Sequence, residues 1–275
     1  MVGKKVVIIS YMSNNKDNKK ASKPSSLYHY TSFKALLKIL NEESLKKQMI
    51  SLRLNNPLQM NDKREVHFFE DYVFCGKIGE EMKQKKERFK KEVGDPYILS
   101  FIHHIRNKGR FSHEIPMWWM YGDNYKGIRL RFDYKTLNEY CQSNWGLLLQ
   151  KCQYETDSNM KEIGKNIRKS FSINDNQDEL EESYKQMALY KSYEWEYENE
   201  WRMLKWCKIE EVKYDDSTGR FYYPIELPLS SLSAIEIGPN ADKDYIKGWL
   251  KIMKEKMEWK ESESFKINNS NLQIR

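Results

Sequence analysis

A short acidic and aromatic stretch holds the residues best suited to chemistry. From Lys191 to Arg202 the chain places Glu196, Glu198 and Glu200 two residues apart. In a β-strand, side chains alternate between two faces, so these carboxylates and Arg202 would share one face. Because like charges on one face repel each other, such a face needs a compensating partner, and a ligand-binding cleft is one candidate. In a helix, the same stretch would hold only an ordinary Glu198–Arg202 pair, worth roughly a few tenths of a kcal/mol.

The aromatic content of this stretch favours the strand. We therefore predict a strand over residues 197–207, with Glu198 and Glu200 facing a cleft. Tyr197, Trp201 and Met203 then point to the opposite face, where we expect core.

A second unusual segment runs from Met117 to Gly127. Its flat side chains can stack on an aromatic ring such as adenine or nicotinamide; they are Trp118, Trp119, Tyr121 and Tyr125. Gly122 and Gly127 allow close approach of the backbone. An aromatic core cluster with two turns explains the same residues, and both interpretations stay open.

His29 is the third candidate. It lies in Leu27-Tyr-His-Tyr-Thr31, a predicted strand that ends at a helix capped by Thr31 or Ser32. A histidine there can donate or accept a hydrogen bond while staying mostly neutral near pH 7. A purely structural histidine is the competing interpretation.

Composition limits the class of protein. Of the 275 residues 32% are charged and 39% are hydrophobic, with 18 Tyr and 8 Trp, and the net charge is +7. This charge favours anionic partners such as nucleotides or nucleic acid. The four cysteines and five histidines have no zinc spacing, so we expect no metal. Neither the Gly-x-Gly-x-x-Gly nor the P-loop pattern occurs.

The first nine residues contain an apolar core too short for a signal peptide or a membrane span, so we expect a cytoplasmic protein that does not enter the membrane. Residues 1–26 are predicted to be an N-terminal strand and a flexible polar leader, and residues 27–275 a single α+β domain. We expect strands at 27–30, 50–54, 97–102, 128–133, 197–207, 221–227, 234–238 and 264–274. Helices are predicted at 33–40, 64–92, 155–193 and 242–257. Asn61-Asp62 lies in a turn-rich loop.

Taken in order, these segments resemble a bacterial family known as domain of unknown function 2971. The resemblance covers residues 27 to about 240. It rests on Leu27-Tyr-His-Tyr-Thr, Asn61-Asp62, Leu99-Ser-Phe, Met117-Trp118 with Tyr121 and Lys126-Gly127, and finally Lys191, Trp195, Glu198, Glu200 and Arg202.

A weaker resemblance carries a chemistry. Tyr28-His29-Tyr30-Thr31 before an amphipathic helix is similar to the opening of ADP-ribosyltransferase-fold enzymes with a His, Tyr, Glu triad. It implies a split sheet with surrounding helices, His29 on a ribose of NAD, Tyr121 on nicotinamide, and Glu200 beside the ribosyl cation. Glu198-x-Glu200 resembles the paired acids of arginine-modifying members. Trp118, Trp119 and Tyr125 compete with Tyr121 for the stacking position, and Arg202 is not part of the triad.

This second resemblance implies an NAD-dependent ADP-ribosyltransferase with an unknown protein or nucleic-acid acceptor, and suggests a toxin or phage-defence effector. Its NAD-binding residues would be His29, Tyr30, Thr31, Ser100, Trp118, Trp119, Tyr125, Lys126 and Arg202. Arg202 would keep Glu200 ionised or bind a phosphate. Lys126, Arg129 and Arg131 are candidates for the pyrophosphate, and a solvated strand face explains them equally well.

Three other functions fit the same residues. An NAD glycohydrolase would use the same site with water as the acceptor. A non-catalytic nucleotide or RNA-binding module would use the aromatic side chains and the positive charge. In an interaction protein, the acids and Arg202 would form a buried salt-bridge network. For the catalytic functions, we predict that His29 and Glu200 face one cleft, bordered by at least one of Trp118, Trp119 and Tyr121.

Overall fold

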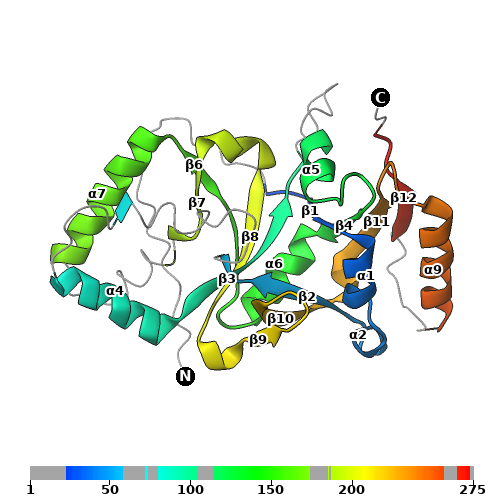
Figure 1. Ribbon diagram of the computed structural model, residues 1–275, viewed down its shortest axis with the longest axis horizontal. Coiled ribbons are helices and arrows are strands. Elements are labelled where there is room, and N and C mark those ends of the chain that lie inside the picture. The colour runs from blue at the N-terminus through cyan, green and yellow to red at the C-terminus, as the bar shows by residue number, and fades with distance from the viewer. Residues whose placement is uncertain are drawn as a thin grey trace.

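The computed structural model describes residues 23–57, 72–73, 80–104, 114–173, 185, 187–256 and 265–272. In these residues a large mixed sheet is surrounded by helices (Figure 1). Its strands are β1 (Ser26–Thr31), β2 (Met49–Asn55), β3 (Asp95–Ile102), β4 (Ile128–Asp133), β5 (Leu148–Lys151), β8 (Glu200–Cys207), β9 (Lys213–Asp215), β10 (Arg220–Pro228), β11 (Leu232–Ile237) and β12 (Lys266–Asn269). The α-helices are α1 (Phe33–Ile39), α2 (Glu42–Lys46), α4 (Glu80–Val93), α5 (Glu114–Met120), α6 (Tyr134–Ser143), α7 (Asp157–Ile173) and α9 (Lys243–Lys256).

The main path of the sheet follows the order β12-β11-β4-β1-β3-β2-β10-β9, and β8 pairs with both β3 and β5. The described pairs in this sheet are antiparallel, except that β11 and β12 run parallel. β3, β4 and β8 share this sheet, as predicted for residues 97–102, 128–132 and 197–205. A separate parallel pair, β6 (Gln153–Glu155) and β7 (Tyr190–Ser192), lies toward the end of the molecule that carries α4 and α7, away from α9 (Figure 1).

β3 is the strand at which the sheet opens. One edge of β3 pairs with β8 along its whole length, from Asp95–Cys207 to Ile102–Glu200. The other edge meets β1 at the single pair Tyr28–Ile102 and β2 at the single pair Asn55–Ile98. β1 and β2 therefore diverge from β3 and from each other, so that side chains from three strands border one opening.

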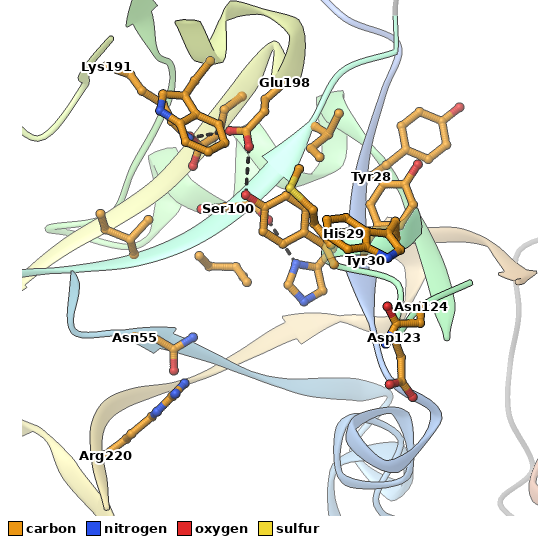
Figure 2. Close-up of a pocket in the computed structure, with 18 residues that line it drawn as sticks. Tyr28, His29, Tyr30, Asn55, Ser100, Asp123, Asn124, Lys191, Glu198 and Arg220 are labelled. Carbon is orange, nitrogen blue, oxygen red and sulfur yellow. Dashed lines mark hydrogen bonds and ion pairs between the residues drawn. The ribbon is translucent and has the colours of Figure 1, made fainter. Parts of the chain in front are cut away.

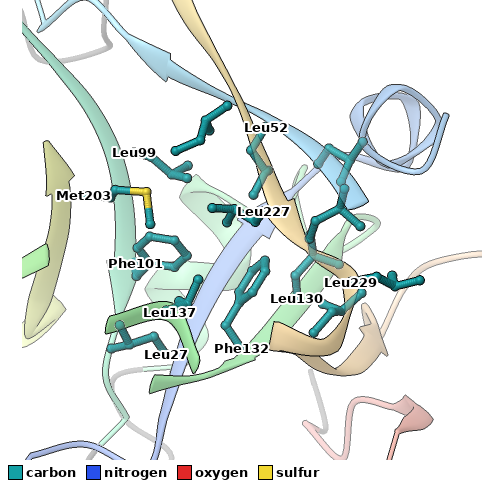
Figure 3. Packing of buried hydrophobic residues seen from close by; sticks show 14 of the residues in the cluster. Leu27, Leu52, Leu99, Phe101, Leu130, Phe132, Leu137, Met203, Leu227 and Leu229 are labelled. Carbon is teal, nitrogen blue, oxygen red and sulfur yellow. The ribbon is translucent and has the colours of Figure 1, made fainter. Parts of the chain in front are cut away.

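The main core fixes the strands around this opening. Figure 3 shows Leu27 of β1, Phe101 of β3 and Phe132 of β4 packed together, and all three are fully buried. The rings of Phe101 and Phe132 meet edge to face with centroids 5.5 Å apart. Met203 of β8 and Leu137 of α6 complete this part of the core. Burying a side chain of this size contributes roughly 1.5–3 kcal/mol, so the core holds these strands firmly in place.

Helix α1 anchors the end of β1. Its N-cap is Ser32, not Thr31: the Ser32 side chain accepts a hydrogen bond from the backbone N–H of Ala35 at 3.1 Å. Leu36 faces the core, whereas Leu37 is 39% exposed. On the outer side, Phe33 packs edge to face against Trp249 of α9. The β1–α1 junction is therefore held on two sides.

The predicted strand over 197–207 begins only at Glu200, so this boundary is wrong. Tyr193–Glu198 forms a 3₁₀ helix, and Asn199 ends it in the left-handed conformation (φ 45°, ψ 51°), which Asn adopts more readily than most residues. The Asn199 side chain also donates to the His103 carbonyl oxygen at 2.6 Å, which fixes the turn. Glu196 is exposed, so it does not share a buried face with Glu200.

Other boundaries also change. The helix expected over 155–193 is described as α7 to Ile173, and residues 190–192 form β7 because Tyr190 and Lys191 are buried beside β6. The helix expected over 64–92 is described from Glu80 onward as α4. Helices α2 and α6 and strands β5, β6 and β9 were not predicted. Asn61-Asp62 and residues 1–22 of the predicted leader lie outside the described residues, whereas Ser26 already belongs to β1.

In the described part of the chain, every helix is too short or too polar to cross a membrane.

Candidate functional site

A cavity of about 850 Å³ occupies the opening beside β3 (Figure 2). Its walls come from β1, β2, β3, β8 and β10, from α5 and the turn after it, and from the segment that starts at Lys191. A cavity of this size is typical of small-molecule and cofactor sites. Both His29 and Glu200 line it, which confirms that they face one cleft.

His29 has a defined tautomer. Its Nδ1 lies 3.0 Å from the carbonyl oxygen of Ser100 on β3. Since a carbonyl oxygen only accepts, Nδ1 carries the proton, and in the neutral ring Nε2 is left as an acceptor. Burial lowers the pKa of His29 below its usual value, and the bond to Ser100 opposes this shift. The neutral ring can therefore accept a hydrogen bond from a ligand hydroxyl group.

Two carboxylates and two cations form a buried network at one wall of the cavity. The Lys191 ammonium group donates to Glu198 and, at 3.1 Å, to Glu200 Oε2. The Arg202 guanidinium group donates to Glu200 twice, from Nε to Oε1 at 3.0 Å and from Nη2 to Oε2 at 3.1 Å. Its Nη1 donates to the Ala188 carbonyl oxygen at 2.7 Å. The network is thus neutral when both acids are ionised.

The two acids differ in their affinity for protons. Burial alone would raise the pKa of Glu200, but Arg202 and Lys191 together hold it well below its usual range. Burial also raises the pKa of Glu198, and here the attraction of Lys191 does not outweigh it. Glu200 is therefore a permanent anion near neutral pH, whereas Glu198 takes up a proton more easily. Paired acids with separated pKa values are a common arrangement for acid–base roles.

The aromatic segment divides between cavity and core. Tyr121 lines the cavity, and its Oη donates a hydrogen bond to Glu198 Oε1 at 2.8 Å. Trp119 also lines the cavity and is 57% exposed. Trp118 is fully buried, with its ring edge to face against Tyr30 at 5.0 Å. The prediction that at least one of the three borders the cleft is confirmed by Trp119 and Tyr121, whereas Trp118 belongs to the core.

The other predicted NAD-binding residues are only partly brought together. Tyr30 and Ser100 line the cavity, and Thr31, Tyr125 and Lys126 do not. Arg202 is fully buried behind Glu200, so its role is to hold that carboxylate and not to bind a phosphate directly.

The predicted pyrophosphate ligands lie elsewhere. Arg129 is 7% exposed and forms ion pairs with Glu236 and, at 3.1 Å, with Glu114. Its Nη1 also donates to Tyr30 Oη at 2.9 Å. Arg131 donates to the Ser233 hydroxyl group at 3.0 Å. The alternation along β4 correctly indicated polar side chains on one face of the strand. These side chains bind to other residues of the protein and do not line the cavity.

Several residues that line the cavity were not proposed as site residues from the sequence: Asn55, Asp123, Asn124, Lys191, Trp195 and Arg220. Figure 2 shows Asn55 and Arg220 side by side below His29. Arg220 is exposed and has no ion-pair partner among the residues described, so its charge is available to a ligand. The register Tyr222–Asn55, which brings β10 beside β2, carries no local signal in the sequence. Lys191 could have been found as the basic residue at the start of the stretch that holds the acidic series.

The described cysteines offer no nucleophile. Cys141, Cys152 and Cys207 are buried free thiols, and burial raises the pKa of Cys141 to about 12. Among the same described residues, no three His, Cys, Asp or Glu side chains come together in a way that could hold a metal ion.

Comparison with known proteins identifies part of the chain. Residues 117–203 match the model of a family described as "Protein of unknown function (DUF2971)". No curated protein and no solved structure matches the chain. The matched segment begins in α5 and ends in β8, and it contains Tyr121, Lys191, Glu198, Glu200 and Arg202. The match to the DUF2971 family model therefore covers the segment that supplies the aromatic and acidic sides of the cavity.

Proposed function

We propose that this protein is an ADP-ribosyltransferase-like enzyme that cleaves the nicotinamide–ribose bond of NAD and passes ADP-ribose to a macromolecular acceptor. One observation carries the proposal. His29 from β1, Tyr121 from the turn after α5 and the acids Glu198 and Glu200 line the same cavity, although they are far apart in the sequence. A sheet that opens at β3 is consistent with the split sheet of that fold.

The chemistry of the proposed reaction suits these side chains. Breaking the nicotinamide–ribose bond develops positive charge on the ribose, as in glycoside hydrolysis, so a nearby carboxylate stabilises the transition state. Glu200 is ionised, as this role requires. Glu198, whose pKa is raised, is suited to accept the proton of an attacking hydroxyl or amine group. The Nε2 acceptor of His29 suits a ribose hydroxyl group, and Tyr121 or Trp119 can stack on a ring.

The far side of the cavity suits the phosphates of the dinucleotide. Arg220 brings an exposed guanidinium group, and Asn55 brings an amide beside it (Figure 2). Guanidinium groups bind phosphate oxygens with two parallel hydrogen bonds. Arg220 therefore replaces Lys126, Arg129 and Arg131 as the proposed pyrophosphate ligand.

A non-catalytic nucleotide-binding module is the second candidate. It is favoured by the ion pairs of Glu200, since both carboxylate oxygens already accept hydrogen bonds from Arg202 or Lys191. A carboxylate held this way can act purely as a structural anion, because breaking a buried ion pair costs several kcal/mol. Such a module would bind NAD without consuming it.

One assay separates these functions. The purified protein is incubated with NAD labelled on the adenylate phosphate, with and without a lysate as acceptor source, and free nicotinamide is quantified. Nicotinamide release with label on protein or nucleic acid supports the transferase. Release with free ADP-ribose as the labelled product in both samples points to a glycohydrolase. Binding of NAD without nicotinamide release in either sample overturns the enzymatic proposal in favour of the binding module.

A further inference from the structure

The turn after α5 has an uncommon backbone. Asp123, Asn124 and Tyr125 are consecutive residues with positive φ angles of 51°, 50° and 68°. This left-handed region is uncommon for residues other than glycine, although Asp and Asn enter it several-fold more often than most. Consecutive residues in this region persist only when the surrounding structure holds them there.

Neighbouring elements supply that support. Tyr125 N donates to the Trp118 carbonyl oxygen of α5 at 3.1 Å, and within the turn Gly127 N donates to the Gly122 carbonyl oxygen at 2.8 Å. From outside, Asn240 N donates to the Tyr125 carbonyl oxygen at 3.0 Å. A Cβ at Gly127 would lie 2.4 Å from the Thr31 carbonyl oxygen, so the turn packs directly on the end of β1. It is thus a rigid part of the cavity rim.

The turn presents two polar side chains to the cavity. Asp123 and Asn124 both line it and are exposed, and neither side chain has a hydrogen-bond or ion-pair partner within the described residues. Figure 2 shows them on the other side of His29 from Asn55 and Arg220. Trp119, which is also exposed, lines the same cavity four residues before Asp123. One side of the cavity therefore combines a stacking face with a carboxylate and an amide.

We propose that Asp123 and Asn124 bind the hydroxyl groups of the adenosine ribose and exclude a phosphate from its 2′ position. A carboxylate accepts hydrogen bonds from two hydroxyl groups at once, and Trp119 stacks on the base that the ribose carries. An acidic residue on the ribose is the means by which dinucleotide-binding folds select NAD over NADP. A 2′-phosphate beside Asp123 would meet a like charge. This inference rests on the proposed function and names the form of the dinucleotide that the site accepts.

Binding of unreactive probes tests it. ADP-ribose and its 2′-phosphorylated form lack the bond that the enzyme would cleave, so calorimetry measures their affinities without turnover. We expect wild type to bind ADP-ribose about tenfold more tightly than the 2′-phosphate, from the repulsion of close charges in water. Asp123→Asn keeps the left-handed turn and removes the charge, so the ratio should fall to about threefold or less. Asp244→Asn, a matched change at an exposed aspartate of α9, should leave the ratio unchanged.

The two failures are distinguishable. Equal affinity for both probes, or an Asp123→Asn ratio equal to that of wild type, overturns this inference alone. Failure to bind either probe overturns the proposed function and this inference with it.

Discussion

Tyr121 and Glu198 are joined by a hydrogen bond of 2.8 Å, from the phenol Oη to the carboxylate Oε1, across 77 positions of sequence. This bond ties the turn after α5 to the 3₁₀ helix that leads into β8. It makes the aromatic and the acidic segments two walls of a single site. It also lowers the pKa of Glu198, against the larger effect of burial.

Tyr121→Phe should therefore change the pH dependence of activity. Losing the donor removes an influence that lowers the pKa of Glu198, so the limb of the pH–rate profile that reports Glu198 should move to higher pH. We expect nicotinamide release to fall about tenfold at neutral pH, which is less than the roughly hundred- to ten-thousandfold loss of a whole acid–base catalyst, because Glu198 itself is retained. Tyr193→Phe, at a 54% exposed tyrosine nearby, is the control. An unshifted profile would show that Glu198 does not titrate during turnover.

Trp119→Ala should weaken nucleotide binding with little effect on stability. Stacking of a base on an aromatic side chain is worth roughly 1–3 kcal/mol, which corresponds to about five- to 150-fold in the dissociation constant. Because Trp119 is 57% exposed, its loss leaves no core cavity. Trp145→Ala removes a 96% exposed tryptophan that does not line the cavity. If calorimetry with ADP-ribose gives the two variants equal affinities, Trp119 is not the stacking residue.

Arg220→Ala should weaken binding of the phosphate-containing part of the dinucleotide and leave binding of nicotinamide unchanged. We expect the affinity for ADP-ribose to fall by about tenfold to 150-fold, since a charge-assisted bond to phosphate is worth roughly 1.5–3 kcal/mol. Binding of free nicotinamide, which carries no phosphate, should stay as in wild type. Lys213→Ala removes an exposed cation of β9 outside the cavity and controls for net charge. Equal losses in both variants would point to a general charge effect.

Stability should fall in mild acid. Burial lowers the pKa of His29 below 6.5, so the folded state binds this proton less readily than the unfolded state. The neutral His29 ring therefore makes its full contribution to the free energy of unfolding above pH 6.5. This contribution is lost as the pH falls below that value. His103, whose pKa is lowered by burial and then by Lys151, adds to the effect. Glu198, whose pKa is raised by burial, acts in the opposite direction, since its contribution is lost as the pH rises.

Melting temperatures between pH 8 and pH 5 check this balance. We expect a steady decrease below pH 6.5 in wild type, and a smaller decrease in His29→Gln, which cannot take up the proton. His103→Gln serves as a parallel variant. A melting temperature of His29→Gln that follows the wild-type curve at every pH would show that His29 contributes nothing to it.

Local patterns predicted most of the sheet because the alternation or apolar run that indicates a strand lies within the residues of that strand. The alternation of Ile128-Arg-Leu-Arg-Phe-Asp and the apolar run from Tyr97 to Ile102 correspond to β4 and β3. The alternation of Glu196, Glu198 and Glu200 wrongly predicted one continuous strand face. The left-handed turn at Asn199 interrupts it, and this turn is fixed by a contact with His103, far away in the chain. Arg129 and Arg131 show a similar limit, since their partners Glu236 and Ser233 come from β11.

Site residues could be predicted where several of them lie close together in the sequence. Glu198, Glu200 and Arg202 stand together in the sequence, and so do Trp119 and Tyr121. Arg220 and Asn55 were missed because their position depends on the pairing of β10 with β2 and on the divergence of β2 from β3. That pairing is a property of the whole sheet and not of either segment.

Glu200→Gln tests the central claim, that the buried ionised carboxylate of Glu200 stabilises the transition state for cleavage of NAD in this cavity. Because Glu200 is paired with Arg202 and Lys191 in the buried network, we expect a stability loss of about 3 kcal/mol. Leu250→Ala, on the buried face of α9, should cost roughly 2–5 kcal/mol without touching the cavity. Both variants are assayed for nicotinamide release from NAD at a temperature where each is folded by circular dichroism. The proposed function predicts a rate about a hundredfold or more below wild type for Glu200→Gln and an unchanged rate for Leu250→Ala. Equal rates in wild type and Glu200→Gln, or no release by folded wild type with NAD and acceptor present, would contradict it.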